Sequence, residues 1–253
     1  MLFRSKDHEP YGLLTLRQVV AKSSNIGMAK LAMQIGEEKV FHYARLFGFG
    51  ERAQRGEGGL PGEEKGLLRD LKNWNKISIT RIPMGYEVAV TNLQMAMAYA
   101  AIANGGKRME PRLIKAVVDR DNRVVMQFIP KVVCQVVRPE TAAKVVEALR
   151  GVVSDTGTAE NAAVPGFEVA GKTGTAQKWS NGVYSKEKYR SSFIGFLPAD
   201  RPEFLVSIMV DEPKGKLYYG GQVAAPAFKN IAIHVAEQLN LNRGAVVATR
   251  EKL

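Results

Sequence analysis

A cation, two hydroxyls and a glycine follow one another at the end of an apolar strand pattern, as Lys172, Thr173, Gly174 and Thr175. The lysine supplies a positive field, and the threonine hydroxyls can donate hydrogen bonds to a carboxylate. The glycine would let the main chain of a ligand lie against the strand, because it has no side chain. These residue types together indicate a site for an anionic substrate, although the same tripeptide also occurs by chance in ordinary strands.

A second polar cluster, Ser23-Ser24-Asn25, places a hydroxyl and an amide two residues apart within an otherwise apolar helical pattern. Serine can relay a proton, and asparagine can hold a substrate amide with both a donor and an acceptor. Serine and asparagine at a helix boundary are also common caps, so the cluster alone decides little. Its order is more informative, because a Ser-X-Asn triplet followed far downstream by Lys-Thr-Gly is the order found in penicillin-recognising enzymes.

Helices are expected before the strand region, and they must carry the serine cluster. Apolar residues at helical spacing run over 14–32 and are interrupted at 23–25, which predicts two helical pieces that meet at a polar junction. Further helices are predicted over 37–46, 91–104 and 139–153, the last with proline in its first turn. The glycine-rich stretch 50–66 is predicted to be a loop.

The second half of the chain is expected to form the sheet that carries the lysine cluster. A hairpin is predicted around Asp121 and Asn122, and three strand patterns follow at 167–177, 191–199 and 203–213. Three consecutive strands suggest an antiparallel meander. A glycine turn is then predicted at Gly220 and Gly221, before an amphipathic helix over 226–239. We therefore expect one α+β unit, with an antiparallel sheet packed by helices and a tail over about 240–253.

Composition and charge exclude several classes of protein. The net charge of +11 comes from 36 basic and 25 acidic residues without any run of five like charges, and no nucleic-acid-binding motif is present, so nucleic acid is not expected as a partner. A single cysteine, Cys134, excludes an intrachain disulfide. The histidines His8, His42 and His234 lack the spacing of metal ligands. No window contains eighteen consecutive apolar residues.

Over residues 7–235 the chain resembles class B penicillin-binding proteins, in longer segments as well as in short motifs. The segments are DHEPYGLLTLRQVVAKSSNIGMAKLA, LPGEEKG with MGYEVAVTNLQMAMAYAAIANGG, VAGKTGTAQ, and YRSSFIGFLPAD through MVDEPKGKLYYGGQVAAPAFKNIA. The SSN triplet and the YYGG segment are more similar to the septal, division-type enzymes than to the elongation-type ones. The resemblance implies a β-lactamase/transpeptidase-like fold, truncated at its N-terminal side.

The resemblance implies that the intact protein is a peptidoglycan D,D-transpeptidase. It also implies that no metal or organic cofactor is needed, because the serine mechanism uses none. In that family a serine attacks the D-alanyl-D-alanine end of a stem peptide, D-alanine leaves, and an amine from another stem takes the acyl group. Ser23 would then shuttle a proton, Asn25 would hold the substrate amide, and Lys172 would polarise the serine and attract the terminal carboxylate. Thr173 and Thr175 would bind that carboxylate, and the Thr175 N–H would form half of the oxyanion hole.

The resemblance also implies a border for the cleft, a location and partners. Gly174 would permit close approach of the substrate, and the cleft would be bordered by Tyr218, Tyr219, Gly220 and Gly221. Two tyrosines at the end of a sheet are equally consistent with simple packing. The intact protein would lie on the periplasmic face of the inner membrane, held by an N-terminal helix absent here. It would bind stem peptides, β-lactams and membrane proteins of the division machinery.

One motif of the family is missing from its expected place. The nucleophile and its lysine lie in an SxxK motif on a helix before Ser-X-Asn, and the 22 residues before Ser23 contain no such motif. The one literal match, Ser185-Lys186-Glu187-Lys188, follows Lys-Thr-Gly in a predicted polar loop that lacks an apolar helix to bury the lysine and lower its pKa. We therefore interpret the chain as the C-terminal part of a transpeptidase domain that is inactive alone.

Two other interpretations remain open at this point. Within the same fold, a β-lactamase or a D,D-carboxypeptidase would send the acyl-enzyme to water, although the long separation between residues 23 and 172 is against them. Outside enzymes, a cell-wall or divisome binding module would recognise stem peptides or partner proteins without chemistry. Hydrolysis of a thioester substrate would exclude the binding module.

Overall fold

The computed structural model describes residues 11–53, 62–180 and 182–241. The chain divides into two compact units, one formed by residues 1–31 with 143–253 and the other by residues 32–142. Two helices, α2 (Asn25–Ile35) and α6 (Pro139–Val153), have residues in both units. The serine cluster and the lysine cluster belong to the first unit.

The sheet of the first unit is the predicted antiparallel meander, which is thereby confirmed. Strands β7 (Ala170–Ser180), β8 (Val183–Leu197) and β9 (Phe204–Asp211) pair in the order β7-β8-β9. In register, Gly174 lies opposite Ser192, and Ser192 lies opposite Met209. Strand β8 is therefore the central strand, and the lysine cluster lies on β7, at one edge of the described sheet.

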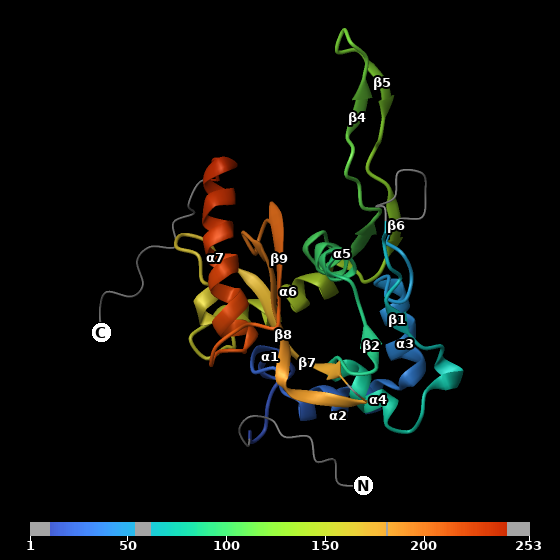
Figure 1. The fold of residues 1–253 in the computed structure, drawn as a ribbon, viewed down its shortest axis with the longest axis vertical. Coiled ribbons are helices and arrows are strands. Elements are labelled where there is room, and N and C mark those ends of the chain that lie inside the picture. The colour runs from blue at the N-terminus through green and yellow to red at the C-terminus, as the bar shows by residue number, and fades with distance from the viewer. Residues whose placement is uncertain (1–10, 54–61, 181, 242–253) are drawn as a thin grey trace. The chain divides into compact units, whose positions relative to one another are not determined.

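Helix α7 (Gly220–Gln238) packs along this sheet (Figure 1), and the hydrophobic core lies between the two. The rings of Phe193 on β8 and Phe228 on α7 meet edge to face, with centroids 4.7 Å apart, and neither is exposed. Small residues, Ala224, Ala225 and Ala232, line the same face of the helix. The core of this unit thus lies between α7 and the strand that pairs with the lysine cluster.

The prediction of a glycine turn at Gly220 and Gly221 is wrong, because both residues belong to the first turn of α7. A Cβ atom on Gly220 would lie 2.3 Å from the Ser192 carbonyl oxygen and 2.5 Å from that of Gly174. A Cβ atom on Gly221 would lie 2.1 Å from the Thr158 carbonyl oxygen. The two glycines are therefore required by close packing of the helix start against the sheet and against the backbone of Thr158, and not by a turn. The helix accordingly starts six residues before the predicted proline start, and Pro226 lies inside it.

The N-terminal helices of the first unit confirm the predicted polar junction. Helix α1 (Leu16–Ala21) begins with a capping box between Thr15 and Gln18, and the chain turns before α2 begins at Asn25. The predicted helix over 139–153 is confirmed as α6, and the short 3-10 helix η3 (Glu160–Ala162) follows it.

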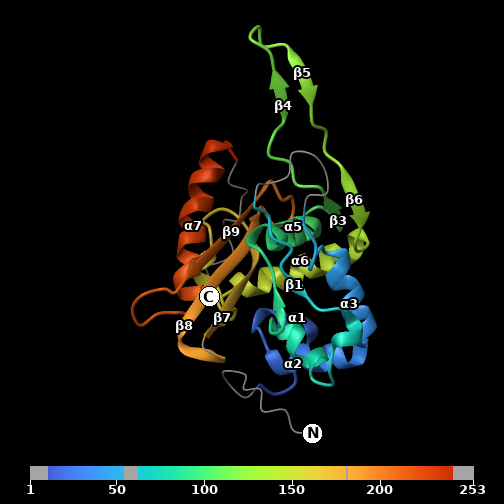
Figure 2. The ribbon, with the colours of Figure 1, turned by 45° about the vertical axis from the view of Figure 1, so that its right-hand side comes forward.

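The second unit contains the remaining elements. They are α3 (Glu37–Leu46), β1 (Leu67–Leu68), η1 (Leu71–Asn73), α4 (Ser78–Arg81), η2 (Ile82–Met84), β2 (Val88–Ala89), α5 (Asn92–Ala103), β3 (Lys107–Met109), β4 (Ala116–Val118), β5 (Val124–Gln127) and β6 (Val132–Gln135). Strands β1 and β2, β3 and β6, and β4 and β5 form antiparallel pairs. The predicted helices over 37–46 and 91–104 and the hairpin are confirmed, with the hairpin extending beyond the β3–β6 pair in both views (Figure 2). Residues 54–61 of the predicted loop lie outside the described residues.

A buried glutamine connects α5 to the glycine-rich segment. Gln94 is 1% exposed, and its amide nitrogen donates to the carbonyl oxygens of Glu51 at 2.7 Å and Lys65 at 3.0 Å. Its side-chain oxygen accepts from the N–H of Thr91 at 2.8 Å, which completes the capping box of the helix. One side chain thus satisfies backbone groups of two segments that lack regular structure of their own.

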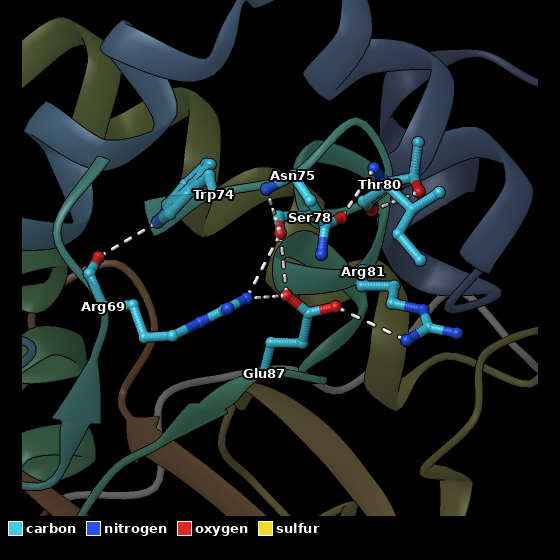
Figure 3. A network of polar contacts seen from close by, with 8 residues as sticks. Arg69, Trp74, Asn75, Ser78, Thr80, Arg81 and Glu87 are labelled. Carbon is cyan, nitrogen blue, oxygen red and sulfur yellow. Dashed lines mark hydrogen bonds and ion pairs between the residues drawn. The ribbon is translucent and has the colours of Figure 1, made fainter. Parts of the chain in front are cut away.

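A charged network joins the short elements between residues 69 and 87 (Figure 3). Glu87 accepts hydrogen bonds from Arg69 and, at 2.8 Å, from the hydroxyl of Ser78, which is fully buried. Its second oxygen lies 3.4 Å from Arg81. The Trp74 indole donates to the Arg69 carbonyl oxygen at 3.0 Å, so the network also fixes this ring.

Replacing Glu87 with glutamine is expected to lower the free energy of unfolding by ~1–3 kcal/mol, since hydrogen bonds to a charged group contribute about this much. The glutamate side chain is 15% exposed, so solvent replaces little of what is lost. Urea denaturation measures the change. Glu38→Gln, at an exposed position of α3, is the control and should stay within ~0.5 kcal/mol of the parent. Equal urea midpoints for both variants would show that the network does not stabilise the fold.

Candidate functional site

Ser23 occupies the turn between α1 and α2 in a conformation that L-amino acids rarely adopt, with φ of +54°. The neighbouring Ser24 is buried, and its hydroxyl oxygen accepts from the N–H of Gly27 at 3.0 Å, so Ser24 caps α2. Asn25 is the first residue of that helix and is half-buried. Ser24 is therefore the helix cap that the sequence allowed for this cluster. Ser23, in contrast, is exposed and has a strained backbone conformation.

Lys172 reaches Ser23 across 149 positions of sequence. Its ammonium donates to the Ser23 hydroxyl at 2.8 Å, and its other contacts are the carbonyl oxygen of Thr173 at 3.3 Å and the hydroxyl of Thr173 at 3.4 Å. All three acceptors are neutral oxygens. The cation has no carboxylate partner among these contacts, so an anionic ligand would find a positive charge that the described residues leave uncompensated.

Burial lowers the pKa of Lys172 to about 8, because removal from water disfavours the charged form of the amine. At this pKa both the ammonium and the free amine are well populated near neutral and mildly alkaline pH. The ammonium can attract a carboxylate, and the amine can take the proton of the Ser23 hydroxyl at 2.8 Å. The pair can therefore bind an anion and exchange a proton.

The two threonines of the lysine cluster are held by partners from other segments. The Thr173 hydroxyl lies 2.8 Å from that of Thr158, and the Thr175 hydroxyl oxygen accepts from the N–H of Gly220 at 3.0 Å. Since Thr175 accepts this bond, its own hydrogen stays available for a ligand. A Cβ atom on Gly174 would lie 2.4 Å from the Ser192 hydroxyl oxygen, so a side chain here would require that hydroxyl to move.

Three tyrosines form a stack beside the first turn of α7. The rings of Tyr189 and Tyr218 are stacked with centroids 4.2 Å apart, and Tyr218 and Tyr219 follow at 4.4 Å. The Tyr218 hydroxyl donates to that of Tyr219 at 3.1 Å, and this bond raises the pKa of Tyr218. Tyr219 directly precedes Gly220, whose N–H contacts Thr175. The stack therefore borders the lysine cluster and also packs the sheet.

Two partners of this site were not predicted from the sequence. Thr158 lies 14 positions before Lys172, outside every segment that resembles the family. Tyr189 lies 17 positions after Lys172, at the start of YRSSFIGFLPAD, but the resemblance assigned no role to it. The strand register places Tyr189 opposite Gln177.

The polar sequence of the chance SxxK match predicted a loop, but the match lies within strand β8. The register between β7 and β8 shifts between Gln177 and Trp179, and the extra residues bulge from β8. The Ser185 hydroxyl oxygen accepts from the N–H groups of Glu187 at 3.1 Å and Lys188 at 3.0 Å. This oxygen organises the bulge.

The described histidines contact a backbone carbonyl oxygen or an aromatic ring. Within the described residues, no group of three or more histidine, cysteine, aspartate or glutamate side chains could hold a metal ion. His234 contacts the Asn230 carbonyl oxygen at 2.7 Å, His42 packs against Tyr43, and His8 lies outside the described residues. Across the part of the chain that the structure describes, every helix is too short or too polar to cross a bilayer.

Comparisons with known proteins agree over most of the chain. Residues 3–232 match the family model described as penicillin binding protein transpeptidase domain. Penicillin-binding protein PbpB of Mycolicibacterium smegmatis is 38% identical over 236 residues, covering 90% of this chain and 36% of the relative. Stage V sporulation protein D of Bacillus subtilis is 39% identical over 222 residues, covering 87% and 34%. The chain thus spans about a third of the length of these curated relatives.

Solved structures show the same similarity. The transpeptidase domain of Burkholderia pseudomallei penicillin-binding protein 3 superposes with a TM-score of 0.82 at 38% identity, covering 94% of this chain and 68% of that one. Penicillin-binding protein 3 of Mycobacterium tuberculosis in complex with ampicillin gives a TM-score of 0.87 at 35% identity, covering 97% and 56%.

Proposed function

Because this chain belongs to the class B penicillin-binding protein transpeptidase family, we propose that it forms the substrate-holding part of a peptidoglycan D,D-transpeptidase site. The observation that carries the proposal is the contact of 2.8 Å between Lys172 and Ser23, beside two threonine hydroxyls. These groups suit a ligand that combines a terminal carboxylate with an amide bond to be broken.

In the proposed reaction, a serine hydroxyl of the family's SxxK motif attacks the carbonyl carbon of the penultimate D-alanine. The amide C–N bond breaks, D-alanine leaves, and an amine from a second stem then displaces the serine from the ester. Through Lys172 and Ser23, the proton released by the attacking hydroxyl passes to the leaving nitrogen, and the proton released by the attacking amine returns to the serine oxygen. Asn25 holds the substrate amide, Thr173 and the Thr175 hydroxyl bind the carboxylate, and the Thr175 N–H stabilises the oxyanion.

The cellular assignments belong to the same proposal. We assign the intact protein to cell-wall synthesis outside the cytoplasm, with stem peptides and β-lactams as ligands and division-machinery membrane proteins as partners. The SSN triplet and the YYGG segment support a septal role. The similar tuberculosis protein is described in complex with ampicillin and with aztreonam, which supports β-lactam binding.

Fluorescent penicillin tests the assignment of the nucleophile. The purified 253-residue chain is expected to remain unlabelled, because the hydroxyl of its one SxxK serine, Ser185, already accepts two backbone hydrogen bonds. Mass spectrometry after denaturing gels measures covalent attachment. A stoichiometric adduct on Ser185 would show that this chain carries its own nucleophile, and turnover of a thioester substrate would show the same.

Peptide binding tests the proposed substrate. A pentapeptide ending in D-alanyl-D-alanine should bind and shift the NMR signals of the Lys172 and Thr175 amides, whereas the same peptide ending in L-alanyl-L-alanine should bind at least ~10-fold more weakly. Equal binding of the two peptides, or binding that leaves these amides unchanged, would contradict the proposed function. It would favour a cell-wall or divisome module of another specificity.

A further inference from the structure

Two exposed aromatic rings lie at the end of the β7–β8 hairpin. Trp179 is 64% exposed and Tyr184 is 41% exposed, and they face each other across the ladder with centroids 4.9 Å apart at 78°. The neighbouring Val183 is also exposed, at 61%. Single exposed apolar residues are ordinary, but an ordered pair of exposed aromatic rings forms a platform that a ligand could cover.

The platform lies on the strand that carries the lysine cluster, because Trp179 belongs to β7. Side chains alternate along a strand, so Trp179 points to the same face as Thr173 and Thr175. The register shift inserts its extra residues into β8, so the alternation along β7 is kept. At ~3.3 Å per residue, Trp179 lies about 13 Å beyond Thr175 and about 20 Å beyond Thr173.

A peptide bound at the lysine cluster can leave it in one direction only. Toward the start of β7 the path is closed, since Val169 is 5% exposed and Ala170 is fully buried. Toward its end, Thr175, Ala176 and Trp179 are exposed. Among the described strands, β7 is hydrogen-bonded on one side only, to β8, so an extended peptide can add to its other edge.

The length of a stem peptide matches this distance. Five extended residues span about 17 Å, so a pentapeptide with its carboxylate between Thr173 and Thr175 would bring its N-terminus to Trp179. In peptidoglycan that end is attached to a sugar of the glycan strand. The C–H groups of a pyranose ring carry small positive charges, and they stack well on the negative face of an indole ring.

The opposite face of the hairpin is held by ion pairs. Lys178 donates to Asp211 at 2.8 Å and to Glu212 at 2.6 Å, and Arg190 donates to Asp211 at 3.0 Å. These bonds connect the end of β7 with the end of β9. These ion pairs restrain the end of the hairpin that bears the two rings, which reduces the conformational entropy lost when a ligand binds.

We propose that Trp179, with Tyr184 beside it, stacks against the sugar that bears the stem peptide, so that the site recognises glycan as well as peptide. The inference rests on the proposed function for the identity of the peptide. It adds a carbohydrate subsite about 13 Å from Thr175 along the same strand.

NMR titrations of the purified chain test the subsite with three probes. They are the pentapeptide ending in D-alanyl-D-alanine, the disaccharide N-acetylglucosaminyl-N-acetylmuramic acid, and the two joined. The chain has two tryptophans, and Trp74 donates its indole N–H to Arg69, so its signal is an internal control. The disaccharide should shift the Trp179 indole signal alone, and the joined probe should bind ~3- to 10-fold tighter than the pentapeptide.

Matched variants test whether the tighter binding of the joined probe depends on the Trp179 ring. Trp179→Ala should reduce the advantage of the joined probe to less than ~2-fold while leaving pentapeptide affinity unchanged, and Trp179→Tyr should restore part of it. Val183→Ala removes a similarly exposed side chain of the same hairpin without a ring, and it should keep the full advantage.

The outcomes separate the two proposals. If the pentapeptide shifts the Lys172 and Thr175 amides but the sugar adds no affinity that depends on Trp179, the subsite is wrong and the proposed function stands. If the disaccharide shifts Trp179 while the pentapeptide binds nowhere, the subsite stands and the proposed function is wrong. If neither probe binds, both are wrong.

Discussion

Replacing Lys172 with methionine is expected to weaken binding of a peptide ending in D-alanyl-D-alanine about 10- to 100-fold at pH 7. A hydrogen bond to a charged group contributes ~1.5–3 kcal/mol, and each 1.4 kcal/mol is a factor of ten in affinity. The contacts of this ammonium in the structure are all to neutral oxygens, so the ligand carboxylate would be its counterion. Isothermal titration calorimetry measures the loss, and an unchanged dissociation constant would remove Lys172 from the site.

The pH dependence gives an independent check on the same residue. Because the pKa of Lys172 is lowered to about 8, the cation is present below that pH and is lost as pH rises through it. Affinity for the peptide carboxylate should therefore be highest near pH 6 to 7 and fall between about pH 7 and 9. Arginine at this position stays charged throughout this range, so Lys172→Arg should bind without that fall. The pKa of Tyr218 is raised, so this neighbour does not titrate in the same window.

The same burial predicts an opposite effect on stability. An ammonium with a lowered pKa in the folded protein destabilises it, because the unfolded chain binds the proton more readily between about pH 8 and 10.5. Stability contributed by Lys172 should thus rise with pH over this interval. Lys172→Met should remove the rise, which separates its structural effect from its effect on binding.

Phe193→Ala is expected to lower the free energy of unfolding by ~3–5 kcal/mol, because it creates a cavity in a closely packed core. Phe193 is fully buried on the central strand, and its ring packs against Phe228 of α7. It also lies opposite Thr173 in the ladder, so the variant should weaken peptide binding as well. Urea denaturation followed by circular dichroism measures the change.

A matched control separates burial from simple loss of apolar surface. Leu217→Ala removes an apolar side chain that is 55% exposed, just before the tyrosine stack. Its effect should remain within ~0.5 kcal/mol. A loss for Phe193→Ala no larger than that for Leu217→Ala would mean that the α7–β8 interface is not the core of this unit.

The regular elements were predictable from the sequence where local signals agree. Helices α3 and α6 begin and end as predicted, and α5 is flanked by a threonine cap and two glycines with positive φ. The predicted α+β fold and the family are confirmed by the matching family model and the solved structures. The short elements β1, α4 and β2 were not predicted, because two to four residues carry no measurable periodicity.

The two wrong predictions have a common physical cause, because a residue type that often marks a turn or a loop can also be required for close packing. Gly220 and Gly221 indicated a turn, but their missing side chains allow close contact of the helix with the sheet backbone and with the backbone of Thr158. Polar residues at 185–188 indicated a loop, but they form a bulge inside a long strand. Packing of this kind depends on the partner segment, which local sequence does not reveal.

The candidate site was predictable only in part. The resemblance implied that Lys172 acts on Ser23, and the two are in contact, but no spacing rule connects residues 149 positions apart. The roles assigned to Ser23, Asn25 and the threonines remain predictions. The contacts of Thr158 with Thr173 and of Tyr189 with Tyr218 were recognised only in the tertiary structure.

The separation between Ser23 and Lys172 also determines when the site can exist during synthesis. Ribosomes add ~5–20 residues per second, so the lysine emerges roughly 7–30 s after the serine. The unit formed by residues 32–142 is complete before its neighbour receives the first sheet strand. Newly made Ser23 therefore belongs to an unfinished unit until the sheet strands have been synthesised.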